Sequence, residues 1–374
     1  MFVAIANTPR YAAWGSTTAI SELFGTEHSA APEAELWFGA HPNSPAQVVD
    51  SEAAGGRETL EQLAPELPFL LKVLAAEKPL SLQAHPTAAQ ARVGFERENA
   101  AGIALDAPER NYRDPHPKPE LLVAVSERFD ALAGFRPIEE SRAIFADFGR
   151  HDIADRLDDL PAFVAWLLSR GEGVAELVEQ VSRHRFADAD TLRLVRALAD
   201  DYPGDPGIVL ALILNRVALR RGEALFVPAG VIHAYLSGVG IELMTASDNV
   251  LSGGLTVKNV DVPELLAVLD FSPGAAPRLE PTRVSATHTE YAAAGAAPRL
   301  AHVSGAATLG PRGPLIALCT EGSFTLRGGT TGCRLERGEA VFVTADEGAI
   351  TVTGSGSLFV ASADSADDPA RSTF

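Results

Sequence analysis

Cysteine is scarce in this sequence, since only Cys319 and Cys333 occur among 374 residues. Two cysteines cannot build the dense disulfide framework of a small secreted domain. Neither of them lies near a candidate metal ligand in the sequence, and a thiolate metal site needs several cysteines at short spacing. We therefore expect two thiols, buried or on the surface, without a disulfide.

Basic residues are also few. The chain has 31 lysines and arginines against 49 aspartates and glutamates, which gives a formal net charge of -18 at pH 7. A surface of this sign repels phosphate-rich polymers and anionic lipid headgroups. The composition therefore argues against nucleic acid and against a membrane surface as partners.

Long apolar runs are lacking as well. The longest, residues 208–214, is far shorter than the roughly 20 residues that span a bilayer. Residues 1–15 contain no basic stretch followed by an apolar block, so they do not resemble a secretory signal. The sequence predicts a soluble protein of the cytoplasm.

The length of the chain predicts more than one domain, because 374 residues exceed what a single compact core supports. Residues 138–204 carry apolar side chains at intervals of three and four with charges between them, which predicts several helices. From residue 208 the pattern of apolar residues becomes strand-like again. Outside the helical block, short apolar runs alternate with glycine and proline, as is typical of strands and turns.

One twelve-residue segment occurs twice. LRRGEALFVPAG at residues 219–230 and LERGEAVFVTAD at residues 335–346 agree at eight of twelve positions, 116 residues apart. An internal duplication is the simplest cause. A glycine-acid turn followed by an apolar strand is typical of hairpins in a small jelly-roll barrel. A looser match of Pro79 with Pro314 makes the helical block an insertion in the first copy.

The predicted fold is therefore mainly β, with two jelly-roll barrels and a helical insertion. The first barrel takes residues 1–137 and 205–272, the insertion residues 138–204, and the second barrel residues 273–374. His233 follows the repeat in the first copy, whereas Ala349 stands at the matching position of the second. We therefore expect the second barrel to be degenerate and structural.

Four residues at strand-like positions of the first barrel could bind one metal ion. Gln83 and His85 alternate with apolar residues in the stretch KPLSLQAH, so a strand would place both side chains on one face. Glu120 opens an apolar run, and His233 follows the repeated segment. Each residue alone fits an ordinary surface position. Together they are nitrogen and oxygen donors that suit Zn²⁺, with Mn²⁺, Fe²⁺ or Co²⁺ as alternatives.

Lysines accompany these candidate ligands. Lys72 is the one charge in a strand-like apolar run, Lys118 precedes Glu120 by two residues, and Lys258 follows the first barrel's last motif. A metal with one carboxylate ligand keeps positive charge and remains a Lewis acid. Any one of these lysines could form a surface salt bridge, but the cluster favours an anionic substrate.

Several runs together resemble type I mannose-6-phosphate isomerase (phosphomannose isomerase). They occur in the family's order, as AELWFGAHP at residues 34–42, KPLSLQAHP at 78–86, KPELL at 118–122, PAGVIHAY at 228–235 and SDNVLSGGLT at 247–256. The resemblance implies a cupin fold with a helical insert, one zinc ion per chain and a small sugar phosphate substrate. It also implies reversible conversion of mannose 6-phosphate to fructose 6-phosphate through a cis-enediol. We expect a monomer.

By motif position, Gln83, His85, Glu120 and His233 resemble the zinc ligands of the family. The residues that resemble its pocket are Glu35, Lys72, Ser81, Lys118, Tyr235, Asp248 and Lys258. For the isomerase chemistry, zinc and Lys118 are candidate electrophiles for the developing oxyanion. Asp248 and Lys72 are candidates for proton transfer.

Three positions depart from the family pattern. Ser252 stands where the family has arginine, Pro117 where it often has histidine, and Val257 where it usually has proline. Loss of a charge-assisted bond to phosphate would cost on the order of 1.5 to 3 kcal/mol. Either Arg113 or Lys258 compensates in the phosphate region around Ser252, or the substrate differs, or the activity is weak.

Three functions therefore follow from the sequence. The first is a zinc-dependent mannose-6-phosphate isomerase. The second is a zinc isomerase of unphosphorylated aldoses, which Ser252 would explain. The third is a catalytically weakened cupin that only binds a sugar or a metal.

Overall fold

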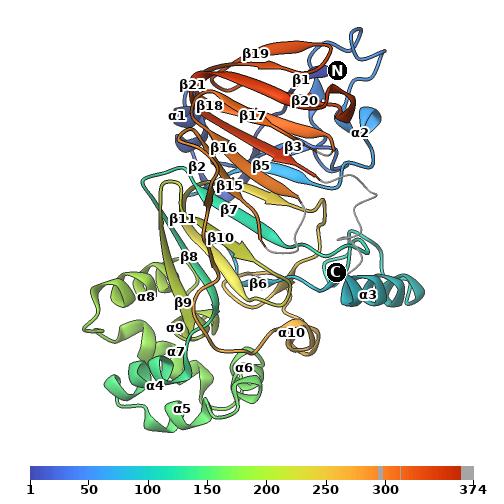
Figure 1. Ribbon diagram of the computed structural model, residues 1–374. Coiled ribbons are helices and arrows are strands. Elements are labelled where there is room, and N and C mark those ends of the chain that lie inside the picture. The colour runs from blue at the N-terminus through green and yellow to red at the C-terminus, as the bar shows by residue number, and fades with distance from the viewer. Residues whose placement is uncertain (294–297, 312, 364–374) are drawn as a thin grey trace.

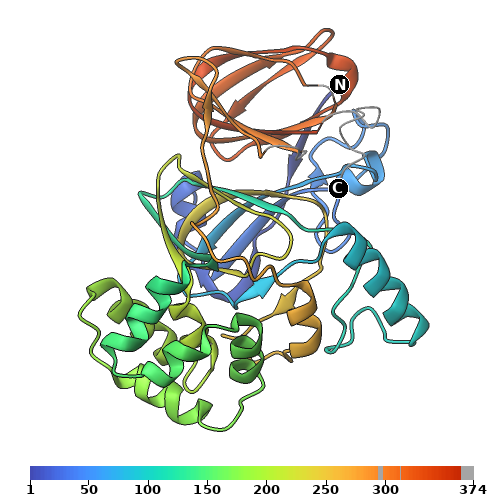
Figure 2. The same cartoon turned by 60° about the horizontal axis from the view of Figure 1, so that its bottom comes forward.

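The computed structural model describes residues 1–293, 298–311 and 313–363. The chain is mainly β, as expected, and forms two antiparallel sheets with a group of helices at one end (Figure 1). The two sheets and the helices form three successive tiers (Figure 1). Figure 2 shows these tiers after a 60° turn, with the sheet of the C-terminal segment at the top. Residues 294–297, 312 and 364–374 of the expected second barrel lie outside the described part.

The strands of the first sheet come from the middle of the chain and from its N-terminal quarter. Along the sheet the order is β13 (Arg278–Leu279), β10 (Ala224–Val227), β7 (Glu120–Ala124), β11 (His233–Met244), β5 (Leu70–Ala76), β2 (Arg10–Ser16) and β3 (Glu33–Gly39). Four further strands branch from this path: β6 (Gln83–Ala84), β8 (Arg128–Phe135), β9 (Leu214–Arg220) and β12 (Leu251–Ser252).

The second sheet combines C-terminal strands with two from the N-terminus. The order is β14 (Thr282–Arg283), β15 (His288–Tyr291), β16 (Arg299–Val303), β21 (Ile350–Ser362), β18 (Leu315–Arg327), β20 (Ala340–Val343), β1 (Phe2–Ala6) and β4 (Gln47–Val48). β17 (Ala307–Leu309) pairs with β21, and β19 (Gly332–Glu336) pairs with β18.

Most helices lie in the tier below the first sheet. This tier holds α4 (Ile138–Asp147), α5 (His151–Arg156), α6 (Leu160–Leu168), α7 (Val174–Arg183), α8 (Ala189–Asp201) and α9 (Gly207–Leu212). The others are α1 (Ala19–Phe24), α2 (Leu60–Leu63), α3 (Ala88–Ala100), α10 (Val262–Val268) and the short 3₁₀ helix η1 (Ala345–Glu347).

The expectation of closed barrels is wrong, because hydrogen bonding among the described residues leaves both sheets open at their ends. In the first sheet the reason lies in β11, which changes partners along its length. Its first half pairs with β6 and β8, and its second half pairs with β5 and β7. The change occurs at a register shift between Tyr235 and Ser237, beside Gly238 at φ +116°. A bulge of this kind lets one strand turn the corner between two layers.

The repeated segment has the same local structure in both copies. Gly222 and Gly338 both take positive φ, +83° and +91°, at the turn before β10 and before β20. The following glutamate accepts a hydrogen bond from the backbone N–H three residues earlier in each copy, at 2.9 and 2.8 Å. β10 then pairs with β7 from Glu120, and β20 pairs with β18 from Leu315. Pro119 directly precedes Glu120, as Pro314 directly precedes Leu315. Pro119 is therefore the counterpart of Pro314, and the looser match with Pro79 is wrong.

The N-terminal strand does not belong to the sheet of its sequence neighbours. β1 pairs with β20, and β4 extends the same edge. Val3 and Ile5 point into the core between the two sheets, together with Phe342 and Ile316. Residues that the sequence analysis assigned to the first barrel thus complete the second sheet.

The apolar run at residues 208–214 is also different from expectation. Residues 208–212 lie in α9 and only Leu214 begins the strand β9, and each side chain of the run is buried. A segment buried on all sides has no apolar periodicity, so helix and strand cannot be distinguished there from the pattern. Helices α4 to α8 lie where the periodicity of residues 138–204 predicts them.

Cys319 is buried, Cys333 is half-buried, and both are free thiols, as expected. Among the described residues, none of the helices combines the length and the apolar character needed to cross a bilayer.

Substitution of the turn glycines should destabilise the protein equally in both copies. An alanine held at positive φ costs about 1 kcal/mol or more, so G222A and G338A should each lower the free energy of unfolding by this amount. G274A is the control, because Gly274 lies in open space without positive φ. Urea denaturation measures the three variants, and wild-type stability of G338A would contradict the turn geometry.

Candidate metal centre and active site

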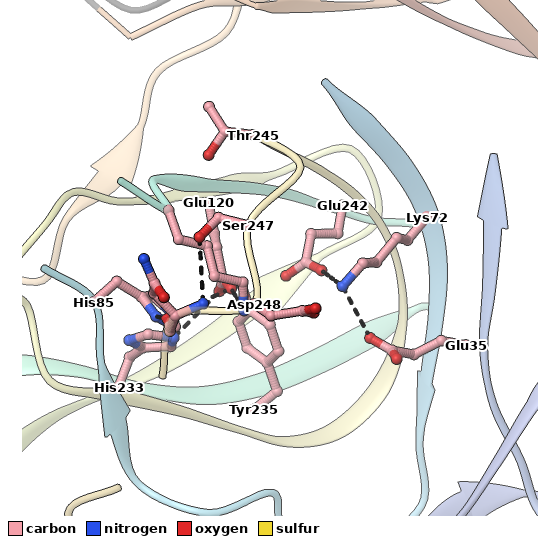
Figure 3. Close-up of polar contacts among 12 residues, drawn as sticks. Glu35, Lys72, His85, Glu120, His233, Tyr235, Glu242, Thr245, Ser247 and Asp248 are labelled. Carbon is pink, nitrogen blue, oxygen red and sulfur yellow. Dashed lines mark hydrogen bonds and ion pairs between the residues drawn. The ribbon is translucent and has the colours of Figure 1, made fainter. Parts of the chain in front are cut away.

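His85, Glu120 and His233 meet at one buried point of the first sheet. His85 follows β6, Glu120 opens β7 and His233 opens β11. All three residues are at most 1% exposed, and one ligand atom from each lies within 4.8 Å of the others. Figure 3 shows the two imidazoles on the same side of Glu120.

The hydrogen bonds at Nδ1 of both imidazoles direct Nε2 toward Glu120, where a metal can bind. His85 Nδ1 lies 2.7 Å from the carbonyl oxygen of Asn249, and His233 Nδ1 lies 3.0 Å from that of Val231. Since a carbonyl only accepts, each Nδ1 carries the proton and each Nε2 keeps its lone pair. This is the usual way in which a metal-binding histidine is oriented.

Distances within the group fit a tetrahedral metal site. Each Nε2 lies 3.2 Å from an oxygen of Glu120. Two ligands that are about 2.0–2.1 Å from one tetrahedral ion lie roughly 3.3 Å apart. Nε2 of His85 is also buried without a hydrogen-bond partner. Because buried polar atoms nearly always have a partner, this nitrogen fits the position of a metal ligand.

Gln83 is placed beside this group by strand pairing. In β6 it lies directly opposite His233 of β11 on one side and Ser252 of β12 on the other. Residues that face each other across antiparallel strands project to the same side of the sheet. The amide of Gln83 therefore projects to the side of the sheet that His233 faces, and it can complete a four-ligand set.

The charges around Glu120 keep its carboxyl group ionised, so that it can bind a cation. Burial alone would raise the pKa of Glu120, but the ammonium of Lys118 outweighs it and holds that pKa well below its usual range. The Lys118 ammonium lies 2.8 Å from Glu120 Oε1. Burial and Lys118 together lower the pKa of His85 to about 4. At neutral pH the site thus offers one carboxylate and a neutral imidazole at His85.

A cavity of about 360 Å³ opens beside the metal group. Nine of the site residues expected from the sequence line it: Glu35, Lys72, Ser81, Gln83, Lys118, Glu120, Tyr235, Asp248 and Lys258. His85 and His233 are fully buried and do not reach the cavity surface. Ser252 and Arg113 are not among the lining residues either.

A second charged group lies on the far side of the cavity from the imidazoles (Figure 3). The Lys72 ammonium bridges Glu35 at 3.2 Å and Glu242 at 3.4 Å, and it lies 4.6 Å from the ring centre of Trp37. Burial lowers the pKa of Lys72, but the two carboxylates outweigh it and raise that pKa. Burial raises the pKa of Glu242 to about 7, because Lys72 offsets only part of the cost of charging it.

Asp248 is held at the cavity by two neighbours from the N-terminal region. Asn43 donates a hydrogen bond of 2.7 Å to Asp248 Oδ2, and His41 Nε2 lies 3.4 Å from the same oxygen. Nδ1 of His41 accepts from the Asn43 backbone N–H. Because Nδ1 accepts, the proton of a neutral His41 is on Nε2 and faces the carboxylate.

Sequence analysis missed several residues of the cavity. These are Trp14, Trp37, Tyr202, Glu242 and Ser247. Glu242 had a usable signal, since it is a lone acid in the apolar run GIELM, as Lys72 is a lone base in its own run. Tyr202 had none, because it ends a block of helices in which no chemistry was expected.

Removal of one imidazole should abolish metal binding. Added to metal-free protein, Zn²⁺ at 100 times its dissociation constant should stabilise the wild type by about 2.7 kcal/mol. H85A and H233A should lose this gain, because each removes a ligand of the buried group. H302A is the control, since His302 bonds Ser357 in the second sheet. Thermal unfolding with and without Zn²⁺ measures the effect, and an unchanged gain in H233A would place the metal elsewhere.

Comparison with known proteins agrees with this geometry. A family model described as phosphomannose isomerase type I, catalytic domain, matches residues 2–138. A second, mannose-6-phosphate isomerase, cupin domain, matches residues 300–363.

Mannose-6-phosphate isomerase of Escherichia coli (strain K12) is 38% identical over 94% of this chain and 97% of its own length. The Homo sapiens protein of that name is 32% identical over 70% of this chain and 71% of its own.

Solved structures are similar over almost the whole chain. Phosphomannose isomerase from Salmonella typhimurium in its apo form has a TM-score of 0.85 at 33% identity, covering 97% of this chain and 99% of that one. A mannose 6-phosphate isomerase described as holo and zinc bound has a TM-score of 0.84 at 33% identity, covering 97% and 100%. The resemblance inferred from the motifs is thus confirmed, and the chain belongs to the type I mannose-6-phosphate isomerase family.

Proposed function

We propose that this chain is a zinc-dependent isomerase that interconverts mannose 6-phosphate and fructose 6-phosphate through a cis-enediol. The observation that carries the proposal is the unpartnered Nε2 of His85, buried 3.2 Å from Glu120 beside a cavity with three lysines. Such a nitrogen is satisfied when a cation takes its lone pair. The names of the relatives support this substrate, and the zinc-bound structure supports this metal.

Gln83, His85, Glu120 and His233 would hold the zinc ion. When bound, zinc supplies Lewis acidity, that is, positive charge for a sugar oxygen that becomes negative during the reaction. Lys118 adds a second fixed positive charge on the cavity wall. Charges that are fixed before the reaction need no reorganisation when the oxyanion develops, so they lower the barrier.

The isomerisation moves a proton between C1 and C2 and therefore needs an acid-base group with a pKa near the working pH. Glu242 fits, because it lines the cavity and burial brings its pKa to about 7. Lys72 is held protonated by Glu35 and Glu242, so we assign it to orienting Glu242 and not to accepting the proton. Asp248 is the alternative base, since Asn43 fixes it at the cavity surface.

Lys258 is the best candidate for binding the phosphate. Of the three cavity lysines, Lys72 and Lys118 already pair with carboxylates. Lys258 lines the cavity, and among the residues that the structure describes no carboxylate forms an ion pair with it. Its charge is therefore available to an anionic group, which supports the phosphorylated substrate although Ser252 replaces the family arginine.

A zinc isomerase of unphosphorylated aldoses is the second candidate. Ser252 favours it, because the family's guanidinium is missing, and Arg113 does not line the cavity as a substitute. The same residues would perform the proton transfer, and only the affinity for the phosphate would be lost.

We also infer the finer organisation of the chain. The shared turn geometry at Gly222 and Gly338 supports an internal duplication that produced two cupin-type units, with residues 138–204 inserted in the first. We extend the proposal to an active monomer, because one chain can supply all the residues assigned to the metal and to proton transfer. A cytoplasmic location is consistent with the absence of disulfides in the described chain.

A direct assay tests the function. Zinc-loaded protein should convert mannose 6-phosphate to fructose 6-phosphate, a chelator should abolish the reaction, and Zn²⁺ should restore it. The value of kcat/KM for mannose 6-phosphate should exceed those for mannose, lyxose and ribose. A preference for the free sugars would favour the second candidate. Absence of turnover with every sugar in metal-replete protein would rule out both and leave a binding protein.

Replacement of the proposed acid-base group should reduce turnover and leave the metal in place. E242Q should lower kcat by about 10²- to 10⁴-fold, the usual contribution of a positioned proton-transfer group. In the wild type, kcat/KM should fall as the pH falls below about 7, because protonated Glu242 cannot accept a proton. E290Q, in the second sheet, is the control. Wild-type turnover of E242Q would exclude this role and leave Asp248 as the base.

A further inference from the structure

The segment between α8 and α9 joins the helical tier to the rim of the cavity. Tyr202 lines the cavity, and its hydroxyl donates a hydrogen bond of 2.9 Å to the carbonyl oxygen of Pro79. Oδ1 of Asp205 accepts from the backbone N–H of Gly207 at 2.7 Å and from that of Leu255 at 3.0 Å. One short segment therefore bonds two separate loops that border the cavity.

Leu255 has a backbone conformation that needs external support. Its φ is +52°, which is an outlier for a bulky side chain. The side chain is fully buried and lines the cavity, so the residue cannot relax toward solvent. Unusual backbone of this kind persists only where surrounding contacts fix it, and such positions cluster at ligand sites. Leu82 bonds the backbone of Gly253 and Gly254 just before this residue, and the hydrogen bond from Leu255 N–H to Asp205 is the contact that fixes Leu255 itself.

Two glycines allow the close approach that this bond requires. A Cβ on Gly207 would lie 2.8 Å from the backbone nitrogen of Leu255, and one on Gly254 would lie 3.0 Å from Cα of Gly207. Both distances are too short for ordinary contact. The segment carrying Asp205 and the loop carrying Leu255 are thus packed backbone against backbone.

The loop held in this way carries Lys258, the lysine proposed to bind the phosphate. After Leu255, the residues Thr256, Val257 and Lys258 all line the cavity. Thr256 Oγ1 accepts a hydrogen bond of 3.0 Å from the Lys258 backbone N–H, so the turn is closed on itself. The direction of the whole turn depends on the backbone angles of the residue at its start, which is Leu255.

We propose that Asp205 is a positioning residue that sets the affinity for the anionic end of the substrate by fixing the Leu255–Lys258 turn over the cavity. The proposal rests on the phosphate-binding role proposed for Lys258. It gives the helical tier a part in substrate recognition, although the tier supplies none of the groups assigned to the chemistry. Asp205 touches neither metal ligands nor the groups assigned to proton transfer, so its loss should affect KM and spare kcat.

The experiment compares D205A with D159A in zinc-loaded protein. Asp159 caps α6 by accepting from the Ala162 backbone N–H, so D159A removes the same type of bond from the helical tier without reaching the cavity. K258A should raise KM for mannose 6-phosphate roughly tenfold or more, as expected for loss of a charged contact to phosphate. D205A should raise KM by a smaller factor at unchanged kcat, and D159A should leave both constants unchanged. D205N retains an oxygen acceptor, so it should restore most of the affinity.

A double variant distinguishes positioning from general destabilisation. Because D205A acts through Lys258, it should not raise KM further in the K258A background. An equal increase of KM in both backgrounds, or an unchanged KM in D205A, would overturn the proposal.

Limited trypsin digestion tests the same idea without relying on a measurement of isomerase activity. D205A should increase cleavage after Lys258 relative to wild type and D159A, since the turn is released. If wild-type protein shows no isomerase activity, the proposed function fails by itself, and the digestion still decides whether Asp205 holds the turn. Equal cleavage after Lys258 in all three proteins would overturn the proposal in that case.

Discussion

The buried carboxylate of Glu120 is the interaction on which the site depends. A carboxylate that is 1% exposed is stable only with opposite charge and hydrogen bonds around it. Lys118 supplies the charge, and Tyr235 donates a hydrogen bond of 3.2 Å. The two imidazoles approach it from separate strands.

This requirement explains why β11 is built as it is. The strand contributes His233 and Tyr235 from its first half and Glu242 from its second. A straight strand would hold all three in one layer, whereas the bulge after Tyr235 lets its two halves pair with different strands. The metal group and the Lys72 group therefore lie at opposite sides of one cavity, which contains three lysines although the chain has a net charge of -18. Local charge of this kind attracts an anion that the rest of the surface would repel.

The sequence indicated the metal group and most of the cavity because their residues are chemically unusual where they occur. Histidine and glutamine on one face of a short strand, and a lysine within an apolar run, are visible without a structure. Glu242 was equally visible and was overlooked. Tyr202 and Asp205 could not be found this way, because their role depends on where the helical tier packs. The closed barrels and the strand at residues 208–214 were wrong for a similar reason: partner exchange along β11 and burial on all sides of α9 are tertiary features that leave no periodic signal.

The pairing of β1 with β20 has a consequence for how the molecule is made. During translation β1 emerges long before β20, so the edge of β1 that pairs with β20 has to wait for its partner, although β4 can already pair with the other edge. Contacts between such distant parts of a chain form slowly, since a long loop has to close before they are gained. The nascent chain is therefore exposed to wrong associations until the second sheet is nearly complete, and chaperone dependence of its production would be a natural result.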